Sequence, residues 1–165
     1  METLNVPQNF INDPSELIQQ VFTTIHHTEM ADLPFINENL SVETVGFALH
    51  EGDWLGVLLT PWTLSLLLLA GPERHWQSFT VGDKFGLKLP SGEYTFFVGG
   101  HEKLGTYLSC SLRSPVNDIH SQQAGIKFAE NIRRLVTAIP TTELQIEDQA
   151  RRTLFNKLLK TEQAE

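Results

Sequence analysis

Hydrophobic residues recur at helical spacing near the start of the chain. Four apolar positions lie three or four residues apart: Ile18, Val21, Phe22 and Ile25. The positions opposite them are polar: Gln19, Gln20, Thr23 and Thr24. Asp13 is a favourable N-cap residue, Pro14 suits the first helical position, and Glu16 completes a capping-box pattern. The sequence therefore predicts an amphipathic helix over residues 14–27.

The spacing then changes to alternation of apolar and other residues. The apolar positions are Val45, Phe47, Leu49, Leu55, Val57 and Leu59. The segment 50–53, His-Glu-Gly-Asp, is typical of a tight turn, so this region predicts a hairpin with at least one buried face. Residues 62–69 are apolar on both faces and fit either a strand covered on both sides or a buried helical turn.

The second half of the chain contains another hairpin and another helix. Residues 73–91 have a mixed pattern and favour an irregular segment with a short helix near Asp83. Alternation over 93–98 and 107–113, around a glycine-containing loop, predicts two more strands. Ser121 is a candidate cap for a helix that Pro140 ends. The apolar stripe of this helix is Phe128, Ile132, Leu135, Val136 and Ile139.

This order of elements predicts an α+β fold. The hairpins imply an antiparallel sheet of about five strands, with the helices segregated to one side of it. The expected order is α-β-β-β-(short α)-β-β-α. The expected organisation is a flexible lead over residues 1–13, a single domain over 14–140, and a basic helical tail over 141–165. A length of 165 residues and a hydrophobic content of 41% suit one folded domain.

Charge is distributed unevenly along the chain. All twelve Lys and Arg residues lie from Arg74 onward. Residues 1–73 hold ten acidic residues and therefore carry −10, whereas the remainder, with twelve basic and ten acidic residues, carries +2. The overall charge of −8 argues against nucleic acid as the main partner. The asymmetry fits either an ordinary solvated surface or an acidic surface for a basic partner segment.

Neither the start of the chain nor its most apolar part predicts a membrane segment. The stretch 55–70 is interrupted by polar residues and falls short of the roughly 20 apolar residues of a spanning helix. The first residues lack the basic and apolar regions of a secretory signal. We therefore expect a soluble, cytoplasmic protein without membrane insertion.

The residues that could support catalysis do not form a convincing site. His101-Glu102 begins like a zinc-protease motif, but Gly105 stands where the second histidine is required. Cys110, the only cysteine, shares an apolar strand face with Leu108, which favours a buried structural thiol. A nucleophilic role would require a lowered pKa and a nearby base. We expect no cofactor, no metal site and no enzymatic activity.

Binding residues are suggested by aromatic and acidic side chains in the first half of the chain. Trp54, Trp62 and Trp76 lie near the densest run of leucines, where they fit either the core or an apolar binding groove. On the second interpretation, Trp54 and Trp62 are apolar contacts for a bound peptide. Glu51 and Asp53, at the predicted turn, are then partners for its arginines.

Several segments resemble the HybE/HupJ family of NiFe-hydrogenase assembly chaperones. They are GVLLTPWTLSLLLLAGP at 56–72, GLKLPSGEYTFFVGG at 86–100 and GTYLSCSLRSPV at 105–116, and the resemblance extends over about residues 15–140. It implies a fold like that of type III secretion chaperones, in which homodimers are common. It also implies a chaperone that binds hydrogenase precursor subunits, including the small subunit with its twin-arginine signal peptide. The alternative is a permanent scaffold of a hydrogenase complex.

Two further expectations concern iron and the tail. Some family members carry a rubredoxin with paired CxxC motifs, but a chain with one cysteine should bind no such iron. The tail segment 150–157 resembles a twin-arginine motif, which suggests a pseudo-ligand for the client site. Its proposed contact residues are Arg151, Arg152, Leu154 and Phe155. An ordinary amphipathic helix is the alternative for this segment.

Overall fold

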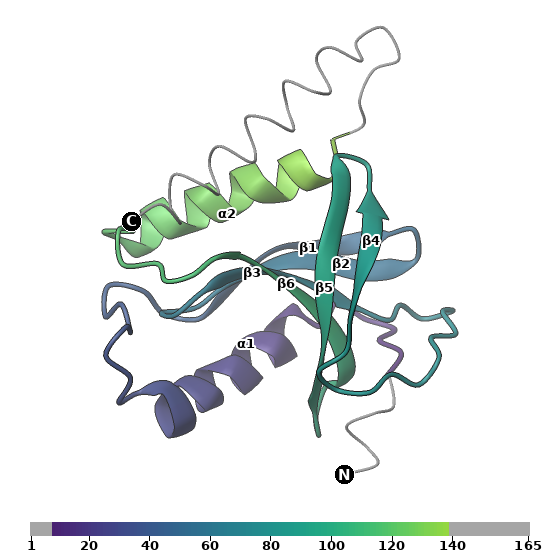
Figure 1. Cartoon of the computed structure of the whole chain (residues 1–165), viewed down its shortest axis with the longest axis horizontal. Helices are drawn as coiled ribbons and strands as arrows, with labels where there is room; N and C mark the ends of the chain where they lie inside the picture. Colours follow the sequence, from purple (N-terminus) through teal and green to yellow (C-terminus); the bar gives the residue numbers. More distant parts are fainter. Residues whose placement is uncertain (1–7, 139–165) are drawn as a thin grey trace, which may run out of the picture.

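A computed structural model describes residues 8–138 of the chain, and the tail residues proposed above lie outside this range. Helix α1 (Ser15–Ile25) continues into a π-helical turn, η2 (His26–Met30), and helix α2 (Gln122–Val136) closes the described chain. Between them lie six strands (Figure 1): β1 (Glu43–His50), β2 (Asp53–Leu59), β3 (Leu64–Leu69), β4 (Lys84–Leu89), β5 (Gly92–His101) and β6 (Gly105–Arg113).

The strands form one sheet in the order β1-β2-β3-β6-β5-β4, and all neighbours are antiparallel. The predicted α+β class and both predicted hairpins are confirmed. The prediction of a short helix near Asp83 is wrong, because β4 begins at Lys84 and pairs with β5 from Lys84↔Phe97 to Leu89↔Gly92. Phe85, Leu87 and Leu89 alternate with residues 84, 86 and 88, which is strand spacing. The sheet therefore has a sixth strand.

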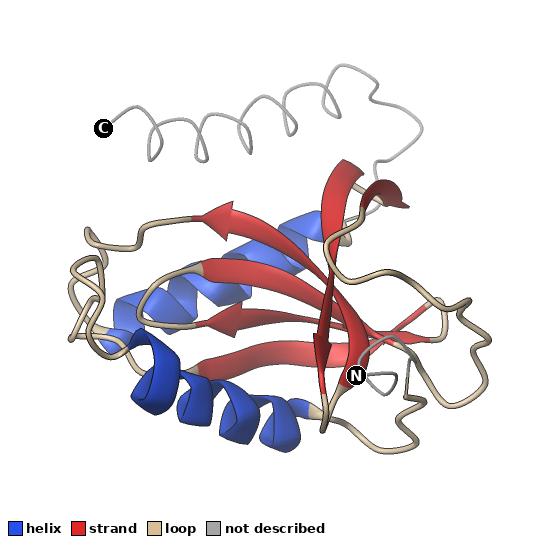
Figure 2. Ribbon diagram, turned by 60° about the horizontal axis from the view of Figure 1, so that its bottom comes forward, coloured by secondary structure: helices blue, strands red, loops and turns tan. Residues whose placement is uncertain are grey.

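The two helices cover opposite faces of the sheet, so the prediction that they lie on one side is wrong (Figures 1 and 2). The reason is visible in β3, where all six residues are buried. Leu66 and its alternate neighbours pack toward α2, whereas Leu67 and Leu69 pack toward α1. A strand that is buried at every position needs cover on both faces. This also settles the ambiguity of residues 62–69 in favour of a strand.

Helix ends follow local side-chain chemistry, with one difference from the prediction. Ser121 caps α2 as predicted, since its hydroxyl accepts from the Ala124 N–H at 3.1 Å. At α1 the N-cap is Pro14, and Asp13 acts one residue earlier by accepting from the Ser15 N–H at 2.9 Å. No helix within residues 8–138 is long and apolar enough to cross a membrane.

Candidate functional site

The tip of the β1–β2 hairpin holds two of the four predicted client-binding residues. Its two-residue loop is Glu51-Gly52, with φ of 52° and 89°, a geometry in which both central residues are left-handed. The Glu51 side chain is 81% exposed and lies 3.9 Å from His50 Nε2. Its carboxylate is therefore available to a partner outside the chain.

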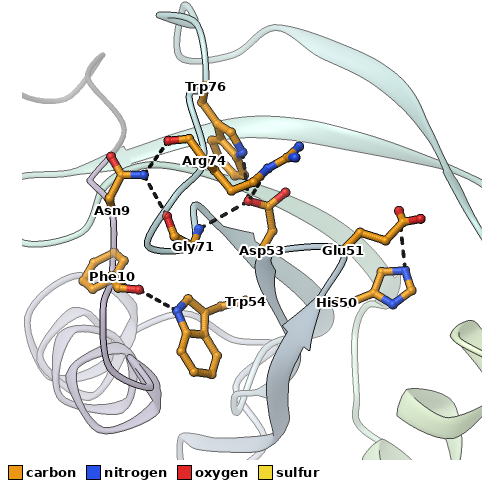
Figure 3. Close-up of polar contacts among 9 residues, drawn as sticks. All are labelled: Asn9, Phe10, His50, Glu51, Asp53, Trp54, Gly71, Arg74 and Trp76. Atoms are coloured by element: carbon orange, nitrogen blue, oxygen red, sulfur yellow. Dashed lines mark hydrogen bonds and ion pairs between the residues drawn. The ribbon is translucent and has the colours of Figure 1, made fainter.

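Asp53 has a different environment, because its carboxylate is buried and already bonded inside the chain (Figure 3). Its Oδ1 accepts from the Gly71 N–H at 3.3 Å, from Arg74 Nε at 3.2 Å and from Trp76 Nε1 at 3.1 Å. One carboxylate oxygen thus fixes the start of the β3–β4 connection against the hairpin tip. The sequence prediction contained neither this internal role nor its donors, because Arg74 and Trp76 follow more than twenty residues later.

Trp54 faces the α1 side of the sheet and holds the N-terminal strap, residues 9–10 (Figure 3). Its indole Nε1 donates to the Phe10 carbonyl oxygen at 2.8 Å, and the Phe10 N–H donates to the Ala70 carbonyl oxygen at 3.0 Å. Asn9 Nδ2 donates to the carbonyl oxygens of Gly71 and Arg74, both at 2.7 Å. Trp54 is therefore engaged in packing and strap attachment.

Trp62 lies beyond the other end of β2, in the β2–β3 connection, and is half-buried against the α1 core. Its ring centroid is 5.8 Å from that of His26 at the end of α1, and His26 stacks on His27 at 5.0 Å. Trp76 belongs to the core on the opposite face, edge-on to Phe79. The three tryptophans therefore do not line one groove. Trp54 and Trp62 lie on the α1 face of the sheet, at opposite ends of β2, and Trp76 lies on the α2 face.

The segment from α1 to the start of β1, residues 15–42, forms a layer without Lys or Arg, which we call the acidic layer. Its acidic side chains are exposed: Glu16, Glu29, Asp32 and Glu38. Burial, and secondarily the neighbouring His27, lowers the pKa of His26, so this ring adds no charge at neutral pH. In contrast, α2 on the opposite face carries three basic residues, Lys127, Arg133 and Arg134, and one acidic residue, Glu130. The uneven charge along the sequence thus becomes a difference between two faces of the fold.

An open groove of about 670 Å³ runs between the acidic layer and the edge strand β1. It is lined by polar side chains: Ser15, Glu16, Gln19, Gln20, Thr23, Thr24 and Thr44. The sequence placed most of these residues on the polar face of α1 but gave no sign that the face borders a concave surface. The signal that could have found it is the run of uncharged Gln and Thr side chains at i, i+4 spacing.

Cys110, the remaining candidate nucleophile, has a structural role. Cys110 is buried on the α2 side of the sheet, and burial raises the pKa of its thiol to about 11. A thiol in that state is a poor nucleophile at neutral pH. Across residues 8–138, no three His, Cys, Asp or Glu side chains come close enough to hold a metal ion.

Comparisons with known proteins agree in sequence and in fold. Residues 13–157 match the profile of the NiFe-hydrogenase assembly chaperone HybE. The Hydrogenase-2 operon protein HybE of Escherichia coli K12 is 35% identical over 146 residues, which cover 88% of this chain and 90% of that protein. The hydrogenase expression/formation protein HupT of Azotobacter chroococcum is 39% identical over 135 residues, covering 80% and 87%.

A solved structure and a longer relative complete the comparison. The solution structure of HybE from Escherichia coli matches with a TM-score of 0.68 and 34% identity, over 87% of this chain and 88% of that one. The probable rubredoxin HupJ of Rhodobacter capsulatus is 35% identical over 125 residues, but the match spans only 45% of its length.

Proposed function

The chain belongs to the HybE family of NiFe-hydrogenase assembly chaperones, and from this premise we propose that it holds hydrogenase precursor subunits in the cytoplasm until they are ready for export. The role of the family is non-catalytic. A chaperone of this kind needs a surface that recognises an immature client and releases the finished one. No bond in the client has to change.

The observation that carries the proposal is the acidic layer. A surface whose charged groups are all acidic attracts a basic segment and repels an acidic one. The export signal of a small-subunit precursor, as a twin-arginine segment followed by an apolar stretch, has the complementary chemistry. We therefore propose the small-subunit precursor as the client, with its basic segment lying on the acidic layer.

The four predicted contact residues divide into two groups under this proposal. Trp62 adjoins α1 and Glu51 has an exposed carboxylate, so both can contact a client directly. Trp54 and Asp53 instead have internal partners, Trp54 in the strap and Asp53 in the β3–β4 connection. Replacing Glu51 with Lys is expected to weaken client binding without loss of folding. Replacing Asp53 with Lys should destabilise the domain, because a buried acceptor for three donors becomes a cation.

Calorimetric titration with three purified ligands tests the proposal. The ligands are the small-subunit precursor, the same subunit without its amino-terminal extension, and the large-subunit precursor. We expect the first to bind most tightly, with affinity that falls as salt rises because exposed charges are screened. Equal affinity for the subunit with and without its extension would contradict the proposed recognition of the signal segment.

A permanent scaffold is the second candidate function. A scaffold would bind mature, metal-loaded enzyme at least as tightly as the precursor. The charged and polar character of the acidic layer favours the chaperone, because permanent interfaces are more apolar than transient ones.

A further inference from the structure

The groove beside α1 has the length of a short extended peptide. From Ser15 to Thr24, a helix rising 1.5 Å per residue spans about 14 Å. An extended chain advances about 3.3 Å per residue, so about four residues cover that distance. The volume of about 670 Å³ lies within the usual range of ligand-binding sites.

One wall of the groove is the edge of the sheet. β1 is the terminal strand, and the Thr44 N–H donates to Gln19 Oε1 at 3.3 Å. The Thr44 hydroxyl lies 3.4 Å from the Ser15 carbonyl oxygen. A side-chain amide thus occupies the place that a carbonyl of a neighbouring strand would take. An extended peptide can replace that long contact with its own backbone carbonyl, as in strand addition to a sheet edge.

The chemistry of the groove fits a peptide that carries arginine. Glu16 is the one charged residue that lines it, and within the described part of the chain its exposed carboxylate has no hydrogen-bond or ion-pair partner. Gln20, also exposed, likewise has no side-chain partner among residues 8–138. A carboxylate receives a guanidinium through paired hydrogen bonds, and neutral amides and hydroxyls bond to a peptide backbone.

We propose that the α1–β1 groove binds about four residues of the client in extended form, with an arginine paired to Glu16 and backbone contacts at Gln19, Gln20 and Thr44. The inference rests on the proposed function and deepens it, because it locates the basic segment of the precursor on particular residues. It gives the polar face of α1 a direct role in recognition.

The test compares two matched double variants of the full-length chain. E16R/Q20R reverses the charge of the groove, whereas Q123R/E130R makes the same changes on exposed positions of α2. The probe is a fluorescent synthetic peptide of the amino-terminal extension of the small-subunit precursor, measured by anisotropy. Because opposed like charges are strongly unfavourable in an interface, we expect about tenfold or greater loss of affinity for E16R/Q20R. The α2 variant should retain wild-type affinity.

The outcomes separate the inference from the proposed function. If the wild-type chain binds the peptide and E16R/Q20R binds it equally well, the groove is not the site and the chaperone function stands. If the wild-type chain binds neither the peptide nor the intact precursor, both fail. Amide chemical shifts of the wild-type chain give a second measurement that needs no variant. Shifts concentrated at Gln19, Gln20 and Thr44 support the groove, and shifts confined to β4 and β5 overturn it.

Discussion

Arg133 on α2 reaches across the sheet edge to Gly46 on β1, where its Nε donates to the Gly46 carbonyl oxygen at 2.9 Å. The same Nε lies 3.2 Å from the Leu55 carbonyl oxygen on β2. Gly46 has a φ of 68° and stands at the irregularity in the β1–β2 register. The Arg133 side chain thus bridges one carbonyl of β1 and one of β2 at the point where the β1–β2 ladder is interrupted.

Replacing Gly46 with Ala should destabilise the domain. The left-handed backbone costs a residue with a Cβ about 1–2 kcal/mol, and the added Cβ would stand 2.6 Å from Arg133 Cγ. Thermal and urea unfolding would measure the loss. Gly82 also has a positive φ, of 101°, but open space around it, so Gly82→Ala isolates the backbone contribution. An equal loss in both variants would show that the Arg133 contact adds nothing.

Asp53 should contribute to the stability of the domain rather than to the charge of its surface. Asp53→Ala leaves the Trp76 and Gly71 N–H groups without their acceptor, and we expect a loss of about 2–4 kcal/mol in the free energy of unfolding. Glu51→Ala, two residues away, removes an exposed carboxylate and should change stability by no more than about 0.5 kcal/mol. Comparable losses in the two variants would contradict the internal role assigned to Asp53.

Cys110 should be unreactive while the chain is folded. Burial raises the pKa of its thiol to about 11, so the protonated form is favoured in the native state through pH 8. The native chain should therefore react with a thiol-specific disulfide reagent at pH 8 far more slowly than the unfolded chain. Because burial opposes formation of the thiolate in the folded state, the free energy of unfolding should fall as pH rises toward 11. Rapid stoichiometric labelling of the native protein would contradict the expectation that Cys110 is buried and unreactive.

Truncation after Pro140 tests the tail hypothesis. If residues 150–157 compete with the client as a pseudo-ligand, the shortened chain should bind the precursor peptide more tightly than the full chain. Circular dichroism must first show that the shortened chain is folded. Unchanged or weaker affinity would leave the tail with no role in client competition.

The hairpins and the amphipathic helices could be predicted because their signals are local. Leu55, Val57 and Leu59 alternate, and Gly52 suits a turn position with a positive φ. β4 has the same alternation, but it is short and follows the irregular stretch 70–83, which hides where the strand begins. The position of the helices on two faces follows from β3, which is buried at every position and so needs cover on both faces.

The site was harder to predict because its parts are far apart in the sequence. In the sequence, Asp53 is typical of a carboxylate at a turn. Arg74 and Trp76 lie more than twenty residues later, and only the fold brings them into hydrogen-bond distance of it. Trp54 and Trp62 are close in sequence, yet a strand separates them in space. The groove joins α1 to Thr44, a pairing that depends on how the helix lies against the edge of the sheet.

The central claim is that this chain binds immature hydrogenase subunits, and the most direct measurement is affinity capture of the full-length protein from a lysate of its native cells. Mass spectrometry would identify the bound proteins and their amino termini. We expect NiFe-hydrogenase subunits that still carry their precursor extensions. Recovery of only mature, metal-loaded enzyme, or of no hydrogenase subunit, would contradict the account.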